Sequence, residues 1–335
     1  MKKEVTTMKD VAKEANVSIA TVSHVINNTK NISKATRMKV MSVIEKYNYK
    51  PNYSAKTLRQ QSTKTAALVI SSYPDSFVTE MIFAIEERAK EMGYNLLLVN
   101  TKENNEYEEK TINLLYSNLV DGILLSPTSG DIQYLHKYTM EKFPIVMINR
   151  YEDSIKNIPR VTGDNFQLGY DATTHLVKHG HKNIGFIFTY PNVSTTADRI
   201  RGYQQALKQA NLPFNEELII QGFAHADGGA DAARELLEKE TKVTALFIQN
   251  DLMTIGAIDA IKKLKKSIPD DIAIIGFGEF SASHIIEPPI TNVVLPPETI
   301  GKIAFDTLLN KINNPDYMSH IELPHSMTIR KSCGC

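Results

Sequence analysis

The sequence predicts an α/β fold in which a small, basic, all-helical N-terminal part precedes a larger body of two doubly wound α/β subdomains. The chain has 335 residues, enough for two or three compact units. Residues 1–61 contain twelve Lys and Arg against four Asp and Glu, a net charge of +8, so the remainder of this neutral chain carries −8. From residue 65 onward, short apolar runs alternate with amphipathic stretches, which is typical of parallel strands covered by helices on both faces.

Two short helices are predicted close to the N-terminus. The pattern from Thr7 to Asp10 resembles a capping box, in which the Thr7 hydroxyl accepts a hydrogen bond from a free backbone N–H. Asn16 favours a left-handed turn, and Ser18 is expected to cap the second helix. The apolar positions at helical spacing are Val11, Ala12, Ala15, Val22, Val25 and Ile26.

A third helix is predicted after the cap residue Ser33, with Val40, Ile44 and Tyr47 on its apolar face. Three such helices with a basic surface favour a helix-turn-helix, in which the first residues of the second helix reach base edges in the major groove. A generic three-helix domain with a solvated basic surface is the alternative. The outward-facing residues of the second helix are Ile19, Ala20, Thr21 and His24, while Thr21 and Ser23 suit phosphate contacts.

Residues 8–27, the pair Thr36-Arg37 and the run 49–52 (Tyr-Lys-Pro-Asn) resemble the DNA-binding head of the lactose-repressor (LacI/GalR) family. His24 stands where many members have Arg, a form that is similar to the purine-repressor branch. The resemblance implies a head at residues 1–53, a hinge helix and linker at 54–64, and a body at 65–335. The DNA-binding residues that it implies are Thr7, Ser18, Ile19, Ala20, Thr21, Ser23, His24, Asn27, Tyr49, Ala55, Leu58 and Arg59.

In this family the hinge segment folds into a short helix on DNA, and Leu58 matches the leucine that wedges into the minor groove at the operator centre. Such a wedge costs a few kcal/mol of base stacking, and this cost is offset because the bent DNA touches more of the protein surface. The alternative, that Leu58 packs on its helical neighbours, is weak in so polar a stretch.

The body contains eight candidate strands, at residues 66–71, 95–100, 122–126, 145–148, 184–189, 218–221, 245–248 and 272–276. The resemblance continues through the body to about Ser332 and implies a periplasmic-binding-protein-like fold with a cleft between two subdomains. Crossover connections are then expected near residues 162–163, 292–296 and 320–324. The N-subdomain is expected at about 65–162 and 296–320, and the C-subdomain at about 163–292 and 321–332.

Ligands of doubly wound folds bind beyond the carboxyl ends of the strands. Several ligand positions of the family match such ends here, among them an aromatic residue that packs on the ligand and an Arg in an Arg-x-x-Gly pattern. Each could instead form a salt bridge or cap a helix. The effector-binding residues that the resemblance implies are Phe77, Arg150, Asp164, Arg199, Asn250, Asp251 and Glu279.

Three positions depart from the family's sugar-binding members. Asn149 and Gly278 stand where those members commonly have Asp, and Leu295 stands where they have Gln. Buried carboxylates discriminate hydroxyl-rich ligands, because leaving a polar partner unpaired is costly. The sequence therefore predicts an effector that is less polyhydroxylated than a simple hexose, or one read mainly by stacking and by Arg199.

Other features exclude several functions. No apolar run approaches the roughly 18 residues of a membrane helix, and no apolar stretch follows the charged N-terminus, so we expect a cytoplasmic protein without a signal peptide. His179 and His181 form an H-x-H pair that is interpreted as a turn after a helix. Cys333 and Cys335 could chelate a metal or cross-link, but we interpret them as a frayed tail, so neither a metal site nor a cofactor is predicted. The chain shows no catalytic constellation, and we do not expect an enzyme.

The predicted function is therefore that of a sequence-specific transcriptional regulator. We expect a repressor whose affinity for its operator is switched by a ligand in the cleft. The expected partners are a pseudo-palindromic double-stranded DNA operator, a second copy of the chain, and a small-molecule effector or a protein corepressor. Induction and corepression both stay open. The alternative is a solute-binding protein of the same body fold without a role on DNA.

Overall fold

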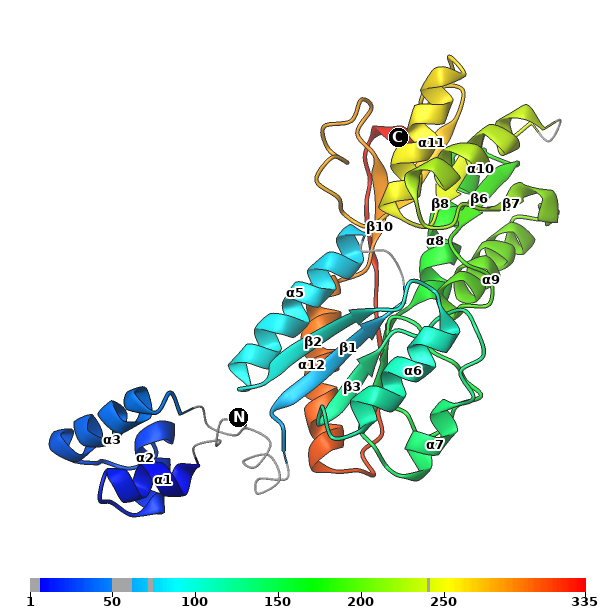
Figure 1. The fold of residues 1–335 in the computed structure, drawn as a ribbon. Helices are drawn as coiled ribbons and strands as arrows, with labels where there is room; N and C mark the ends of the chain where they lie inside the picture. Colours follow the sequence, from blue (N-terminus) through cyan, green and yellow to red (C-terminus); the bar gives the residue numbers. More distant parts are fainter. Residues whose placement is uncertain (1–6, 50–61, 72–74, 240–241) are drawn as a thin grey trace. The chain divides into compact units, whose positions relative to one another are not determined.

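The computed structural model describes residues 7–49, 62–71, 75–239 and 242–335. The chain divides into two compact units, Met1–Ser62 and Thr63–Cys335. The fold is α/β, with the helical head in the first unit and two six-stranded sheets in the second, as expected from the sequence (Figure 1). Within the described residues, no helix is long and apolar enough to cross a membrane.

The head consists of the helices α1 (Met8–Glu14), α2 (Ile19–Asn27) and α3 (Lys34–Lys46). The Thr7 hydroxyl accepts from the Asp10 N–H while the Asp10 carboxylate accepts from the Thr7 N–H, which confirms the predicted capping box. Asn16 adopts the left-handed conformation at φ 49°, and Ser18 and Ser33 cap the next two helices. The buried core consists of Val11, Ala12, Ala15, Val22, Val25, Val40, Val43 and Tyr49.

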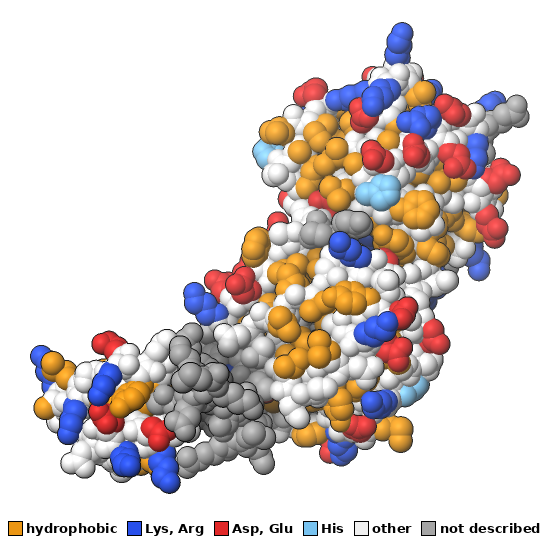
Figure 2. Space-filling view, in the orientation of Figure 1, with side chains coloured by type: hydrophobic (Ala, Val, Ile, Leu, Met, Phe, Trp, Pro, Cys, Tyr) orange, Lys and Arg blue, Asp and Glu red, His pale blue; other side chains and the backbone are white. Residues whose placement is uncertain are grey.

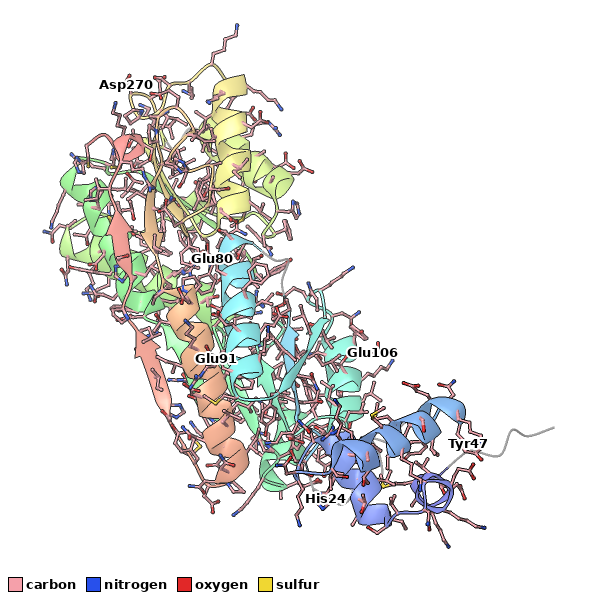
Figure 3. The ribbon with its side chains drawn as sticks, turned by 90° about the vertical axis from the view of Figure 1, so that its left-hand side faces the viewer. His24, Tyr47, Glu80, Glu91, Glu106 and Asp270 are labelled. Atoms are coloured by element: carbon pink, nitrogen blue, oxygen red, sulfur yellow. The ribbon has the colours of Figure 1, made fainter. Side chains whose placement is uncertain are left out.

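One core prediction for the head is wrong. Tyr47 is 41% exposed, and Val43 occupies the place in the core that was expected for it. The helical spacing fails there because α3 ends at Lys46, and the left-handed Asn48 (φ 46°) then turns the chain so that Tyr49 packs inward. Figure 3 shows Tyr47 at this end of the head, and His24 on α2.

The first subdomain of the body is built on a sheet with the strand order β11-β5-β4-β3-β1-β2, and all its pairs are parallel. Side chains alternate between its faces, so one face packs on α6 and α7 and the other on α5 and α12. The bounds are β1 Thr65–Ile70, α5 Ser76–Glu91, β2 Asn95–Asn100, α6 Asn105–Tyr116, β3 Gly122–Leu125, α7 Leu135–Met140, β4 Ile145–Ile148, β5 Arg160–Gly163, α12 Pro297–Asn313 and β11 His320–Leu323.

The second subdomain repeats this plan with the order β12-β10-β9-β8-β6-β7, in which only β12 is antiparallel to its neighbour. One face packs on α8 and α9, and the other on α10 and α11. The bounds are α8 Asn165–Lys178, β6 Ile184–Phe188, α9 Ser194–Gln209, η1 Glu216–Leu218, β7 Ile219–Gln221, α10 Ala226–Glu238, β8 Ala245–Ile248, α11 Asp251–Lys263, β9 Ala273–Phe277, β10 Thr291–Val294, β12 Ser326–Thr328 and η2 Lys331–Cys333.

The chain passes between the two subdomains three times, from β5 to α8, from β10 to α12 and from β11 to β12. These passages lie near the three places where crossovers were expected. The passages that follow β5 and β11 are paired with each other, because the Asp164 N–H donates to the Leu323 carbonyl at 2.9 Å. The carboxyl ends of the strands therefore face each other across the space between the subdomains.

Candidate functional site

A cavity of about 40 Å³ lies between the two subdomains, at the carboxyl ends of their strands. Both subdomains contribute to its wall, which combines aromatic rings with buried polar side chains. Such a mixture is typical of a ligand-binding cleft. The lining residues are Asp75, Phe77, Val78, Asn149, Arg150, Thr189, Thr195, Arg199, Ala224, Gln249, Asn250 and Phe277.

Arg199 of α9 is the central cation of this cavity and is only 3% exposed. Its Nε donates to Asn165 Oδ1 and one terminal nitrogen donates to the Gln249 carbonyl, both at 2.9 Å. The guanidinium also stacks on Phe277, 4.0 Å from the ring centroid. Burial lowers the pKa of Arg199 to about 9, opposed by Asp75 and Asp198, so the group stays charged near neutral pH.

Two closely packed glycines place Arg199 against α8. A Cβ on Gly169 of α8 would lie 2.3 Å from the Arg199 carbonyl oxygen, and a Cβ on Gly202 of α9 would lie 2.1 Å from the Phe166 carbonyl oxygen. Only glycine allows α8 and α9 to approach this closely. The short helix-to-helix distance brings Arg199 within hydrogen-bonding reach of Asn165.

Replacing Gly202 by Ala is therefore expected to destabilise the body by about 1–3 kcal/mol, because the new methyl group collides with backbone atoms of α8. In an uncrowded helix the same change stabilises by about 1 kcal/mol, so the sign of the effect is itself the test. Thermal denaturation measures it, and Lys208→Ala, at an exposed position of α9, serves as a control with an effect within about 0.5 kcal/mol. A stabilised Gly202→Ala variant would contradict the close packing.

Asp75 faces the same cavity from the start of α5, where its carboxylate accepts a hydrogen bond of 2.8 Å from the Val78 N–H. Burial raises the pKa of Asp75 to about 7, and the neighbouring Asp251 carboxylate adds to the rise. The Val78 N–H and the charges of Arg199 and Arg150 oppose it. Near neutral pH this carboxyl can therefore either donate a hydrogen bond to a ligand or accept one.

This raised pKa makes stability depend on pH. Between the ordinary aspartate pKa and about 7, folded Asp75 keeps a proton that the unfolded chain has released, so stability falls as pH rises through this window and levels off above it. Asp75→Asn removes the titration but keeps a capping side chain. Between about pH 5.5 and about pH 8.5 we expect the wild type to lose roughly 2 kcal/mol more than Asp75→Asn. Denaturant titrations at both pH values measure this, and parallel profiles would contradict the assignment.

Arg150 also lines the cavity, just after β4, and one of its terminal nitrogens is held within the first subdomain. It forms a 2.6 Å ion pair with Glu103 and donates to Ser71 Oγ and the Pro127 carbonyl. Its guanidinium carbon lies 5.7 Å from the Tyr190 ring centroid, in the second subdomain. Arg150 therefore presents a positive charge to the cavity, held in place through the contacts of this one nitrogen.

Four of the seven predicted effector residues, Phe77, Arg150, Arg199 and Asn250, come together in this cavity. The other three are not among its lining residues. Asp164 caps α8 through the Gln167 N–H, and Glu279 pairs with Arg330 at 2.5 Å. Both residues lie just after strands, β5 and β9, but their side chains are directed to other partners.

Asp251 is the third residue outside the lining, and it connects the two subdomains. Its carboxylate, at the start of α11, accepts from the N–H and from the hydroxyl of Ser76 at the start of α5, at 3.0 and 2.6 Å. A second connection joins Tyr151 to α9, where its N–H donates to Ser194 Oγ and its hydroxyl donates to Asp198, both at 2.9 Å. These contacts join the two subdomains directly.

Several lining residues were not identified from the sequence, notably Asp75, Thr195 and Gln249. Asp75 follows β1 and caps α5, so the rule that ligands bind beyond strand ends could have selected it. Gln249 follows β8 in the same way, and its amide bridges the Thr189 N–H and the Thr196 hydroxyl. Of the three departures noted above, Asn149 lines the cavity at φ 60°, whereas Leu295 lies fully buried in the core.

In the head, the start of α2 presents its side chains to solvent. Ser18, Ile19 and Ala20 are exposed, and Ile19 is 48% exposed although it is apolar. Thr21 and His24 are half-buried beside them, and His24 Nδ1 lies 2.8 Å from the Thr29 hydroxyl. An exposed apolar residue flanked by small hydroxyl groups is suited to contacting the edges and methyl groups of bases.

The remaining predicted DNA-binding residues differ in their surroundings. Thr7 is exposed. The Asn27 amide donates to the Ser23 carbonyl at 2.8 Å and to the Ser23 hydroxyl at 3.3 Å, so the Ser23 and Asn27 side chains lie on one side of α2. Tyr49 is only 8% exposed and packs in the core of the head, so it supports the helices. Ala55, Leu58 and Arg59 lie outside the described residues.

Comparisons with known proteins match both parts of the chain. Residues 7–52 match the family described as bacterial regulatory proteins, lacI family, and residues 62–331 match periplasmic binding proteins and sugar binding domain of LacI family. Catabolite control protein A of Priestia megaterium is 35% identical over 329 residues, which cover 97% of this chain and 98% of that protein. The transcriptional repressor PurR of Pasteurella multocida is 34% identical, with the same coverage.

Among solved structures, the lac repressor dimer bound to operator and the anti-inducer ONPF has a TM-score of 0.84 at 23% identity, covering 98% of this chain and 99% of that one. This similarity supports the fold, with a helical head and a two-sheet body. The named relatives are transcription regulators, and none of these comparisons supports a solute-binding protein without a DNA role.

Proposed function

Because this chain belongs to the lacI family of DNA-binding transcriptional regulators, we propose that its head reads a pseudo-palindromic operator and that a small ligand in the cleft sets its operator affinity. The observation that carries the proposal is the pairing of two features in one chain. The start of α2 is solvent-facing and capped by Ser18, and the cleft holds a buried cation, Arg199, stacked on the Phe277 ring. We assign it to the cytoplasm and assign no reaction to it.

The DNA-binding part of the proposal rests on α2. Its first turn is fixed by Ser18, whose hydroxyl accepts from the Thr21 N–H at 3.0 Å, so the outward side chains are preorganised before DNA arrives. Ile19, Ala20 and His24 are proposed to contact base edges, and Thr21 and Ser23 to contact phosphates. Tyr49 is proposed to position the helices, and Leu58 to act as the minor-groove wedge.

A homodimer is proposed from the surface of the first subdomain. β2 is an edge strand of its sheet, yet Leu97 and Leu98 on it are 42% and 47% exposed. Phe83 of α5 and Leu114 of α6 are more than 60% exposed nearby, and Figure 2 shows hydrophobic side chains gathered over these elements. Apolar patches of this kind mark protein–protein contacts, and a second copy would cover the edge of the sheet.

The effector is proposed to carry an anionic or acceptor group for Arg199 and a flat or apolar face for Phe77 and Phe277. These rings lie 5.5 Å apart in an edge-to-face arrangement. The departures at Asn149 and Gly278 remove carboxylates that would read sugar hydroxyls. A simple neutral hexose is therefore not the expected ligand.

The cavity measures about 40 Å³, room for about three water molecules. A larger ligand is proposed to enter a more open cleft in which the Ser76–Asp251 and Tyr151–α9 contacts are broken, and closure around the ligand would restore them. The angle between the subdomains then depends on ligand. A coupling free energy of about 1–3 kcal/mol between cleft and operator is typical of such regulators.

Calorimetric titration tests the ligand class. Neutral hexoses and pentoses, sugar phosphates, and planar carboxylates or purines would be titrated into the full chain. We expect binding by a member of the anionic or planar groups, and loss of that binding in Arg199→Met, which keeps an apolar stem over Phe277. Micromolar binding by an ordinary hexose would refute the proposed ligand class, while leaving the DNA-binding function untouched.

A further inference from the structure

Four potential metal ligands, two from the end of α8 and two from the C-terminal residues, lie close together beside α8. His175 and His179 lie one turn apart at the end of this helix, and their ring centroids are 4.6 Å apart. Cys335 Sγ lies 3.3 Å from His175 Nε2 and 3.2 Å from His179 Nε2. Cys333 Sγ lies 3.1 Å from Cys335 Sγ, and both cysteines are free.

The C-terminal segment is firmly docked, so the expectation of a frayed tail is wrong. Cys333 is fully buried, and η2 packs on β9 and β10. The Ser332 hydroxyl accepts from the Thr291 N–H and donates to the Ile274 carbonyl, both at 2.8 Å. Gly334 is left-handed at φ 86°, which turns the chain so that Cys335 returns to the end of α8. The turn thus brings both sulfurs to one side.

Ordinary hydrogen bonds do not satisfy this group fully. The Cys335 thiol has one proton, yet its sulfur is within contact distance of two imidazole nitrogens and a second sulfur. A cation placed among the four lone pairs would satisfy all of them. His175 Nε2, Cys333 Sγ and Cys335 Sγ already lie within 4.8 Å of one another, with His179 next to Cys335.

The spacing is close to that of a tetrahedral metal centre. With metal–sulfur bonds of about 2.3 Å and metal–nitrogen bonds of about 2.0 Å, tetrahedral ligands lie roughly 3.5 Å apart. The three separations at Cys335 are 3.1–3.3 Å, close to this value. His179 is not one of the three ligand atoms that lie within 4.8 Å of one another, so its ring must move closer to the other ligands to complete a tetrahedron. The Thr291 hydroxyl, 3.1 Å from Cys333 Sγ, can support a sulfur ligand from outside the site.

We propose that His175, His179, Cys333 and Cys335 form a site for a thiophilic transition-metal ion, with Zn²⁺ as the expected ion. Two thiolates and two imidazoles are a donor set that zinc prefers over magnesium or calcium. The two thiolates would balance its charge. The bound ion would cross-link the C-terminal turn to α8, next to the strand that crosses between the subdomains, where His325 Nε2 lies 3.2 Å from Asp171 of α8.

Cobalt titration of the full chain, without an affinity tag and kept reduced, tests this site. We expect one Co²⁺ per chain, a visible spectrum of tetrahedral cobalt, a near-ultraviolet sulfur-to-cobalt charge-transfer band, and displacement by Zn²⁺. Cys335→Ser and His175→Ala should weaken binding at least about tenfold and reduce the charge-transfer band or the tetrahedral spectrum. Cys335 is exposed, so its replacement leaves the fold intact, unlike that of the buried Cys333.

His181→Ala is the matched control. This histidine lies two residues beyond His179, but its Nδ1 faces the Thr244 hydroxyl at 3.0 Å, so cobalt binding should not change. Absence of the charge-transfer band, or equal cobalt binding by the wild type and Cys335→Ser, would overturn the proposal. A chain that carries a Cys333–Cys335 disulfide and takes up no cobalt after reduction would overturn it as well.

Discussion

Removing residues 1–62 is expected to reduce affinity for the operator by a factor of at least about 10³, the usual ratio of specific to non-specific binding. The deletion removes α2 and its exposed recognition residues. It also removes the positively charged part of the chain, because residues 1–61 carry a net charge of +8 and the rest of the chain carries −8. The remaining body would be repelled by phosphates. Fluorescence anisotropy with a labelled operator duplex measures the loss.

The body itself is expected to survive this deletion, because it is a separate compact unit with its own cores. Its unfolding midpoint and effector affinity should equal those of the full chain within error. A chain lacking residues 1–62 whose operator affinity stayed within tenfold of that of the full chain would show that the body contains the DNA-binding site. That result would contradict the proposal that the head binds DNA and the body binds the effector.

Arg199→Ala is expected to destabilise the body by about 2–6 kcal/mol, roughly 1–3 kcal/mol for each buried acceptor left unpaired, and to abolish the response to effector. The change leaves Asn165 Oδ1 and the Gln249 carbonyl without their buried donor, and exposes one face of Phe277 to an empty space. It also removes the positive charge that opposes the raised pKa of Asp75. Denaturant titration measures the stability, and operator binding with and without effector measures the response.

Arg234→Ala is the control for this variant, since Arg234 forms an exposed ion pair with Asp231 on α10. Such pairs contribute about 0.5 kcal/mol or less, so stability and effector response should be nearly unchanged. Similar losses in both variants would mean that the effect of Arg199→Ala comes from general loss of positive charge rather than from the cleft.

Much of the fold followed from local patterns in the sequence. The caps Thr7, Ser18 and Ser33 and all eight candidate strands were found where local chemistry placed them. The prediction that Tyr47 lies in the core of the head was wrong, because helical spacing does not indicate where α3 ends. The periodic spacing of apolar residues identifies helices and strands well, but it does not define where their last turn ends.

The cleft was predictable only in part, because its chemistry depends on partners that are far apart in the chain. Asn250 was identified after a strand and Arg199 from the family's Arg-x-x-Gly pattern, but the Ser76–Asp251 contact joins residues 175 positions apart. The raised pKa of Asp75 comes from burial, which no local pattern reveals. Likewise, Cys335 meets His175 across 160 positions, so its surroundings could not be deduced from the tail alone.

The central claim is that two copies of the head read an operator through α2. Selection of duplexes from a random pool by the full chain, followed by sequencing, tests it most directly. The account predicts a two-fold symmetric consensus of inverted half-sites, with altered half-site preference in His24→Ala and no enrichment by the chain lacking residues 1–62. An asymmetric consensus, or equal enrichment by the headless chain, would contradict it.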